Sequence, residues 1–313
     1  MSNNNTRTET VGFKGGRNIP ASPTFISRIL GENGLQKWIF YLPVAFMFLF
    51  FVIPTMLTVV WSFFERTMFW MKPGFTFFSY INFFTSSRFD NFLSSIFHSS
   101  ISVFICLILG FPIAVFVRRN VPQVAQHRVI LLFILPFMVS EIIRTFMLRP
   151  VLGRNGLVNS VLLQIGIISD PITVILFSPL GVIIGDVLSF MPFIVFAGFL
   201  AMEAVPKYVF EVCQDLGAGK WRTMIDIIIP LAAPGIFAGS VFIFVNALGV
   251  ALIPSILGGP GAVNAGLIAT QAIAALDFPL AMAISAIMMV TLFGLLYVGH
   301  RLFNLTRILE PTA

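Results

Sequence analysis

The sequence predicts an all-α integral membrane protein with six transmembrane helices, on grounds of composition and of pattern. The 313-residue chain is 58% hydrophobic and only 10% charged, whereas soluble domains carry about 25% charged residues. Six apolar stretches each reach the ~20 residues that a helix needs to cross ~30 Å of hydrocarbon. These stretches are residues 38–63, 96–117, 129–148, 172–200, 230–257 and 278–302. Because hydrocarbon offers no partners for backbone hydrogen bonds, we expect them to be helices.

The remaining segments divide the chain. Residues 1–36 are polar and contain no short apolar core followed by a small-residue cleavage site, so they predict a disordered cytoplasmic tail rather than a signal peptide. Residues 37–95 hold the first transmembrane helix and an outer loop. Residues 96–304 form a core of five spans with a polar loop at 203–230 between the fourth and the fifth. Residues 305–313 form a second cytoplasmic tail.

The distribution of basic residues sets the expected orientation. With the N-terminus in the cytoplasm, thirteen Lys and Arg residues fall on the inner side, five on the outer side, and Arg144 within a span. The positive-inside rule favours this arrangement, which places both termini in the cytoplasm. The basic residues form no stripe, so no nucleic-acid partner is expected.

Residue patterns that would indicate enzyme chemistry are missing from the sequence. Cys106 and Cys213 lie in different elements, and none of the three histidines has a ligand partner three or four residues away, so neither a disulfide nor a metal site is expected. The run Gly217–Lys220 resembles a phosphate loop, but Gln214 and Trp221 stand where that loop needs Gly and Ser or Thr. The sequence therefore predicts no catalytic residues and no cofactor bound by this chain.

The polar loop at 203–230 is the main candidate for a functional site. Pro206 suits the first turn of a helix, and Glu211 and Asp215 lie four residues apart on one face. Gly217 ends this helix or lets a partner's backbone approach closely. The apolar residues recur at spacings of three and four on another face: Tyr208, Val209, Val212, Cys213 and Leu216. The same spacing also fits an interfacial helix that lies on lipid.

This loop resembles the EAA loop of ABC importer permeases. That motif reads E-A-A, three residues, G, nine residues, I-x-L-P, and here Glu211–Cys213, Gly217 and Ile227–Pro230 match its spacing at every fixed point. Bulkier residues replace the two alanines, and isoleucine replaces the leucine. The resemblance assigns contact with an ATPase to the following residues: Glu211, Asp215, Leu216, Gly217, Ala218, Ile227 and Pro230.

A longer stretch, residues 134–285, is similar to the spermidine/putrescine-type branch of these permeases. The matching pieces are ILPF (134–137), GRNGLVNSVL (153–162), MPF (191–193), DLGAGKW (215–221), IPLAAPGIFAG (229–239), IPSILGG (253–259) and FPLAMAIS (278–285). The stretch from the first of these pieces to the last covers about half of the chain.

The resemblance implies a subunit with a MetI-like five-helix core in the bacterial cytoplasmic (inner) membrane. Its expected partners are membrane lipid, a homologous second permease, two ATPase subunits that bind the ATP and magnesium, and an extracytoplasmic solute-binding protein. The short helix around Glu211 is expected to insert into a groove on one ATPase. ATP-driven closure would then switch the core by alternating access.

Four polar residues within the spans are candidates for the substrate pathway: Glu141, Arg144, Asp186 and Asn246. Burying a lone charge in hydrocarbon costs about 2.5–3.5 kcal/mol, so these groups need partners or water. Two interpretations remain open. Arg144 neutralises Glu141 or Asp186 and fixes the packing of the helices, or these side chains line a cavity that contacts the solute.

The sequence identifies the transported solute less closely than it identifies the class of transporter. The resemblance favours a polyamine, but polyamine-type permeases tend to have G-[ED]-F-x-x-P in the fifth span, and here Val250 replaces the acid and Ala251 the aromatic residue. A non-polyamine small organic solute is the alternative. An ion-coupled secondary transporter is more remote, because no inverted repeat is visible. A membrane-embedded enzyme would need a cluster of acid, base or metal ligands near one boundary, and no such cluster is evident in the sequence.

Overall fold

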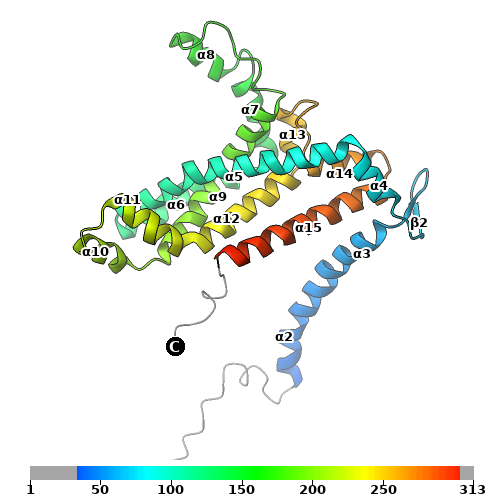
Figure 1. The fold of residues 1–313 in the computed structure, drawn as a ribbon, viewed down its shortest axis with the longest axis horizontal. Coiled ribbons are helices and arrows are strands. Elements are labelled where there is room, and N and C mark those ends of the chain that lie inside the picture. Colours follow the sequence, from blue (N-terminus) through cyan, green and yellow to red (C-terminus); the bar gives the residue numbers. More distant parts are fainter. Residues whose placement is uncertain (1–33, 304–313) are drawn as a thin grey trace, which may run out of the picture. The chain divides into compact units, whose positions relative to one another are not determined.

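The computed structural model describes residues 34–303 (Figure 1). Of the predicted tail at residues 1–36, residues 1–33 lie outside the described residues, as does the predicted tail at residues 305–313. Residues 34–36 of the predicted tail belong to a helix instead. The chain divides into two compact units, Met1–Met56 and Leu57–Ala313. The mostly helical structure agrees with the predicted fold class.

The described part of the first unit is a single apolar helical run. It consists of α2 (Gly34–Met47), the π-helix η1 (Phe48–Val52) and the start of α3 (Ile53–Trp61). The π-helix widens the turn directly before Pro54, where a proline ring would otherwise clash with the carbonyl one turn earlier. The apolar segment Tyr41–Trp61 is long enough to cross a membrane, and none of its residues is buried. Such a helix has its apolar side chains available to lipid.

The second unit begins with a feature that the all-α prediction did not contain. Two strands of two residues each, β1 (Glu65–Arg66) and β2 (Met71–Lys72), pair as an antiparallel hairpin. The helix α4 (Phe78–Thr85) follows. Arg66 donates hydrogen bonds of 3.0 Å to the Asp277 carboxylate and to the Ala275 carbonyl, so the hairpin is attached to the turn before the last helix.

Four long helices make up the body of the second unit: α5 (Ser87–Asn120), α9 (Pro179–Glu203), α12 (Ile229–Gly249) and α15 (Phe278–Phe303). They run side by side in Figure 1, with α9 packed against both α5 and α12. The largest buried cluster lies where these helices meet and contains Ile183, Phe190, Ile194 and Ile243. This arrangement makes α9 the central helix of the bundle.

Small residues allow α9 and α12 to approach closely. A Cβ atom added at Gly235 would lie 2.6 Å from the Cβ of Ala201, and one added at Gly239 would lie 2.6 Å from the Cβ of Ala197. The two glycines are four residues apart on α12, and the two alanines are four apart on α9. This is the small-xxx-small pattern by which helices pack in membranes. Larger side chains at these positions would force the two helices apart.

The third predicted span, residues 129–148, is not one continuous helix, and the prediction is wrong on this point. The structure has α6 (Gln123–Met138) and α7 (Glu141–Leu152), followed by α8 (Leu157–Gln164), with a bend of 84° between the α6 part and the α7–α8 part. The backbone is extended at Val139 and at Ser140. Pro136 also removes a backbone donor just before the break, which weakens the last turn of α6.

The fifth predicted span, residues 230–257, is likewise divided. The helix α12 ends at Gly249, and a separate short helix, α13 (Leu252–Leu257), follows. Between α13 and α15 lies a further helix, α14 (Ala265–Ala274), that the six predicted stretches did not include. Asn264 fixes this region: its Oδ1 accepts from the Leu267 amide, and its Nδ2 donates to the carbonyls of Ala247 and Val250.

Among the described residues, five helices are long and apolar enough to cross a membrane, or six if the bent pair is counted as one span. The six predicted spans therefore correspond to the upper count.

Candidate functional site

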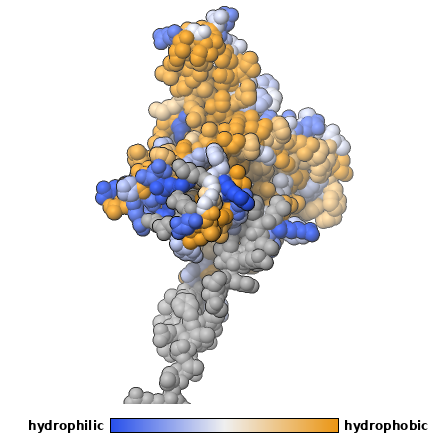
Figure 2. Space-filling model, turned by 60° about the vertical axis from the view of Figure 1, so that its left-hand side comes forward, coloured by the Kyte–Doolittle hydropathy of each residue, from blue (hydrophilic) through white to orange (hydrophobic). Residues whose placement is uncertain are grey.

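The polar loop between α9 and α12 forms the first part of the candidate site. It contains α10 (Lys207–Asp215), α11 (Lys220–Thr223) and the π-helix η2 (Met224–Ile228). Figure 2 turns this end of the second unit forward and shows hydrophilic residues gathered there, with a largely hydrophobic surface above. A helix thus lies where the spacing from Lys207 predicts one.

The apolar stripe of α10 is only partly buried. Cys213 is 4% exposed, and Val209 packs against a buried cluster that includes Met202, Val205 and Ile228. The rest of the stripe, formed by Tyr208, Val212 and Leu216 at intervals of four residues, stays exposed, and Leu216 is 80% exposed. One edge of the stripe therefore anchors α10 to the bundle, and the other edge leaves an apolar surface uncovered.

Gly217 ends this helix in the way that the sequence predicts. Its φ of +70° lies in the left-handed region, which costs other residues energy. The Ala218 amide donates to the Cys213 carbonyl at 2.9 Å, a bond that spans five residues and is the mark of a Schellman turn. A Cβ at Gly217 would meet no atom within 4 Å, so the backbone at this position is open to a partner.

The chain then returns to the bundle through η2. Ile228 is fully buried and Ile227 half-buried, whereas Pro230 is exposed. As at Pro54, a π-helix of five residues ends two positions before the proline. Arg222 and Asp226 form an exposed ion pair at 3.4 Å. The motif residues Ile227 and Pro230 therefore belong to the junction of the loop with α12.

The second part of the site is a group of polar side chains at the contact of α5, α7 and α9, here called the buried polar cluster. Its six members are Ser102, Glu141, Arg144, Thr145, Asp186 and Ser189. Asp186 is 2% exposed, and its Oδ2 accepts a hydrogen bond of 3.2 Å from the Ser102 hydroxyl. Four buried atoms of the cluster have no hydrogen-bond partner: Glu141 Oε1, Arg144 Nε, Thr145 Oγ1 and Ser189 Oγ.

Arg144 bonds to main-chain carbonyls rather than to a carboxylate. Its Nη1 donates to the Ser189 carbonyl at 3.2 Å and to the Pro136 carbonyl at 3.5 Å, and its guanidinium lies 5.4 Å from the centre of the Phe137 ring. Pro136 is in the last turn of α6, and its carbonyl also accepts a hydrogen bond of 3.3 Å from the Val139 amide. Arg144 therefore ties the broken end of α6 to the middle of α9.

Glu141 and Asp186 supply the negative charges of the cluster. Glu141 is the first residue of α7, where the free amides and the helix dipole favour a carboxylate. Its charge interacts with both Arg144 and Asp186. In the part of the chain that the structure describes, no ion pair within 4.0 Å joins Arg144 to either acid. Arg144 therefore lies near both acids without a direct ion pair to either, and the two interpretations of these charges stay predictions.

Asn246, the fourth predicted pathway residue, is placed differently. Its Nδ2 donates to the Phe242 carbonyl of its own helix at 2.8 Å, so the structure gives it no bond to the buried polar cluster. Phe242 in turn stacks on Phe193 of α9, with ring centres 3.8 Å apart. Asn246 is thus a half-buried residue of α12 beside a contact between α9 and α12.

Sequence reasoning did not identify Ser102, Thr145 and Ser189 as members of the buried polar cluster. Thr145 follows Glu141 by four positions, and Ser189 follows Asp186 by three, so each pair shares a helix face. That periodicity could have identified Thr145 and Ser189 from the sequence. Ser102 lies 84 positions before Asp186 and carried no comparable signal.

Comparison with known proteins relates both parts of the site to one family. The family model described as "Binding-protein-dependent transport system inner membrane component" matches residues 124–311, which include α7, α9 and the polar loop. The spermidine/putrescine transport system permease protein PotB of Escherichia coli (strain K12) is 34% identical over 217 residues, which cover 69% of this chain and 78% of that protein. PotB of Haemophilus influenzae (strain ATCC 51907 / DSM 11121 / KW20 / Rd) is 30% identical over 281 residues, covering 87% and 96%.

A solved structure agrees with the fold. It is the crystal structure of a bacterial ABC transporter involved in the import of the acidic polysaccharide alginate. The match has a TM-score of 0.62 and 18% identity, and it covers 85% of this chain and 96% of that chain. At this identity the likeness concerns the arrangement of helices alone.

Proposed function

The chain belongs to the family of binding-protein-dependent transport system inner membrane components, and from that premise we propose that it is the permease subunit of an ATP-driven importer. In this role it binds no nucleotide and catalyses no reaction, because partner ATPase subunits hydrolyse the ATP. The observation that carries the proposal is the place of α10. The segment with EAA-loop spacing forms a short helix outside the bundle, between α9 and α12, and keeps part of its apolar stripe uncovered.

We propose that α10 couples the bundle to one ATPase. The exposed edge of Tyr208, Val212 and Leu216, next to the exposed Asp215, offers the mixed apolar and acidic surface that suits a groove on a partner. The buried edge of Val209 and Cys213 ties α10 to the base of the bundle. A force applied to α10 would therefore be transmitted to α9 and α12 rather than absorbed by a loose loop.

Transport would proceed by alternating access between this chain and a homologous second permease. The close approach of Gly235 and Gly239 to α9 supports movement of α9 and α12 as one rigid body. An extracytoplasmic binding protein would deliver the solute at the end of the second unit that carries α13 and α14, opposite α10 (Figure 1). With α10 in the cytoplasm, both termini are also cytoplasmic, in agreement with the distribution of basic residues.

A polyamine is the solute that we propose first. Two relatives that match most of the chain are named as spermidine/putrescine permeases, and the buried polar cluster holds two carboxylates against one guanidinium. The observation against this choice is Val250, which stands where polyamine-type permeases tend to have an acid. A non-polyamine small organic solute is therefore the second candidate. An ion-coupled secondary transporter would leave the exposed stripe of α10 without a purpose.

The test is ATP-dependent uptake by the assembled complex in proteoliposomes. The double variant Glu211→Lys with Gly217→Asp should abolish uptake while the chain still inserts and still co-purifies with the second permease. Charge reversal at Glu203, at the end of α9 but outside α10, is the matched control and should leave uptake within twofold. Normal uptake by the double variant would refute the coupling role. Full activity of the chain without any ATPase would refute the proposed class.

A further inference from the structure

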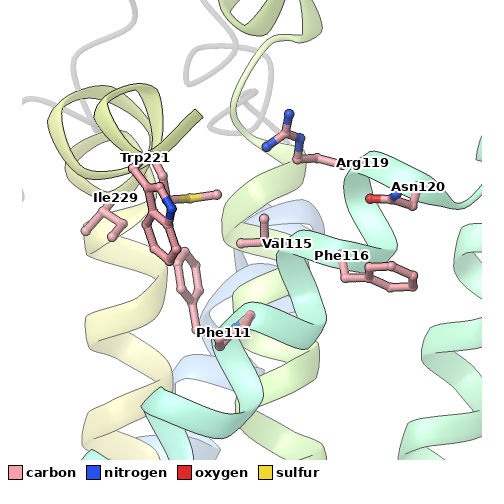
Figure 3. A pocket seen from close by; sticks show the side chains of 9 residues that line it. Phe111, Val115, Phe116, Arg119, Asn120, Trp221 and Ile229 are labelled. Carbon is pink, nitrogen blue, oxygen red and sulfur yellow. The ribbon is translucent and has the colours of Figure 1, made fainter. Parts of the chain in front are cut away.

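A groove lies between the last part of α5 and the segment that leads into α12 (Figure 3). Its volume is about 610 Å³. The α5 wall is formed by Phe111, Val115 and Phe116, and the opposite wall by Trp221, Met224 and Ile229. Arg119 and Asn120 lie at one end, so the groove is apolar along its length and polar at its mouth.

The charges around this mouth are mainly positive. At this end of the second unit, the sequence places seven basic residues against four acidic ones: Arg118, Arg119, Arg128, Lys207, Lys220, Arg222 and Arg301 against Glu203, Glu211, Asp215 and Asp226. Two of these arginines lie in the last turn of α5. Arg118 turns into the bundle, where its Nε donates to the Met202 carbonyl at 3.3 Å and its Nη1 to the Gln126 side chain at 3.4 Å. Arg119 is exposed and extends at the mouth of the groove (Figure 3).

We propose that this groove binds one acyl chain of an anionic phospholipid, with the phosphate at Arg119. An apolar channel that follows the helices and ends at a cation matches a lipid, whose apolar chain and charged headgroup have the same order. Basic pockets between helices at the membrane surface are known to hold anionic headgroups. Trp221 is 81% exposed beside the mouth, and tryptophan favours the headgroup level of a bilayer. The volume falls in the range of ordinary ligand sites.

This lipid site goes beyond the proposed function and does not depend on the solute. Because the groove joins α5 to Trp221 and Met224, a bound lipid would contact both the bundle and the segment that follows α10. The site is therefore a place where lipid composition acts on the loop that we propose to be driven by the ATPase.

The first experiment is native mass spectrometry of the complete complex, extracted from membranes that contain phosphatidylglycerol and phosphatidylethanolamine. The wild-type complex should retain phosphatidylglycerol on this chain. Arg119→Gln should lower its occupancy about fivefold, as expected for the loss of one cation near the surface. Arg119→Lys should keep it. Arg128→Gln removes a charge at the same end but outside the groove and should have no effect.

The second experiment uses phosphatidylglycerol with a photoreactive group in its acyl chain, added to the wild-type complex. Lipid adducts on residues 111–120 and 221–229 support the proposal. Three outcomes overturn it: equal lipid retention by Arg119→Gln and wild type, an equal loss in Arg128→Gln, or adducts confined to other helices. A photoreactive residue at position 116 that reacts with another subunit, and not with lipid, also overturns it.

Discussion

The charged side chains of the polar loop between α9 and α12 and those of the buried polar cluster differ in their exposure to solvent. In the loop, Asp215, Arg222 and Asp226 are exposed, and water solvates them. In the cluster, Asp186 and Ser189 are almost inaccessible, and Arg144 satisfies main-chain carbonyls of two other helices. The loop therefore has charges that can be changed at little cost to folding, whereas Arg144 of the cluster joins α7 to α6 and α9.

Because of this difference, substitutions in the loop should change transport, whereas substitutions in the cluster should change stability. An exposed surface residue contributes to function only through a partner, so its replacement should leave the fold intact. Removing the one cation of a buried group of charges leaves its acidic partners uncompensated. Substitutions in the two regions should therefore differ in which measurement they change, and the following variants test that contrast.

The largest effect on uptake is expected at the exposed edge of α10. Leu216→Asp places a carboxylate in the surface that we propose to enter the ATPase, where an apolar anchor contributes about 2 kcal/mol. Uptake should fall roughly thirtyfold, while the thermal unfolding midpoint of the complex stays within 1–2 °C of wild type, on the order of a 0.5 kcal/mol change. Arg222→Gln, which breaks only an exposed pair, is the control and should change neither quantity. If Leu216→Asp transports normally, the exposed edge of α10 is not a docking surface.

The next effect concerns folding. Arg144→Met removes the donor to the Ser189 and Pro136 carbonyls and leaves Glu141 and Asp186 without a nearby cation. The free energy of unfolding should fall by about 3–5 kcal/mol, measured by thermal or denaturant unfolding in detergent. Arg144→Lys keeps the charge but loses the planar guanidinium group. Its free energy of unfolding should therefore lie between those of the wild type and of Arg144→Met. Wild-type stability of the Met variant would mean that the break after α6 does not depend on Arg144.

The same contrast explains which features the sequence could predict. Glu211, Gly217 and Pro230 are specified by spacing along the chain, so the helix α10 and its glycine end were predictable before any contact was known. The contact of Ser102 with Asp186 joins positions 84 residues apart, and no local pattern encodes it. The break at Val139 and Ser140 was hidden because residues 129–148 as a whole are apolar enough to form one span, and hydrophobicity does not report backbone direction. The division between α12 and α13 was missed for the same reason.

Asp186→Asn tests whether the excess negative charge of the cluster serves transport or packing. Asparagine keeps the shape and can still accept from Ser102, but it leaves Glu141 and Arg144 as a balanced pair. We expect the free energy of unfolding to rise by about 1 kcal/mol and uptake of spermidine or putrescine to fall several-fold, because a cationic solute loses a carboxylate. Uptake is measured in proteoliposomes and stability by thermal unfolding. If uptake is unchanged, Asp186 is a packing residue and not part of the pathway.

A small effect on stability is also expected at Asn246, so a role of this residue in the pathway would appear as a change in uptake. The described hydrogen bond of its side chain goes to the Phe242 carbonyl of its own helix, so Asn246→Ala should change the free energy of unfolding by no more than about 1 kcal/mol. If Asn246 faces the solute, uptake should nevertheless decrease several-fold, with the concentration for half-maximal uptake raised. A variant with unchanged uptake and unchanged stability would remove Asn246 from the pathway. A decrease in uptake that is matched by a decrease in stability would instead assign Asn246 to the packing of α12 against its neighbours.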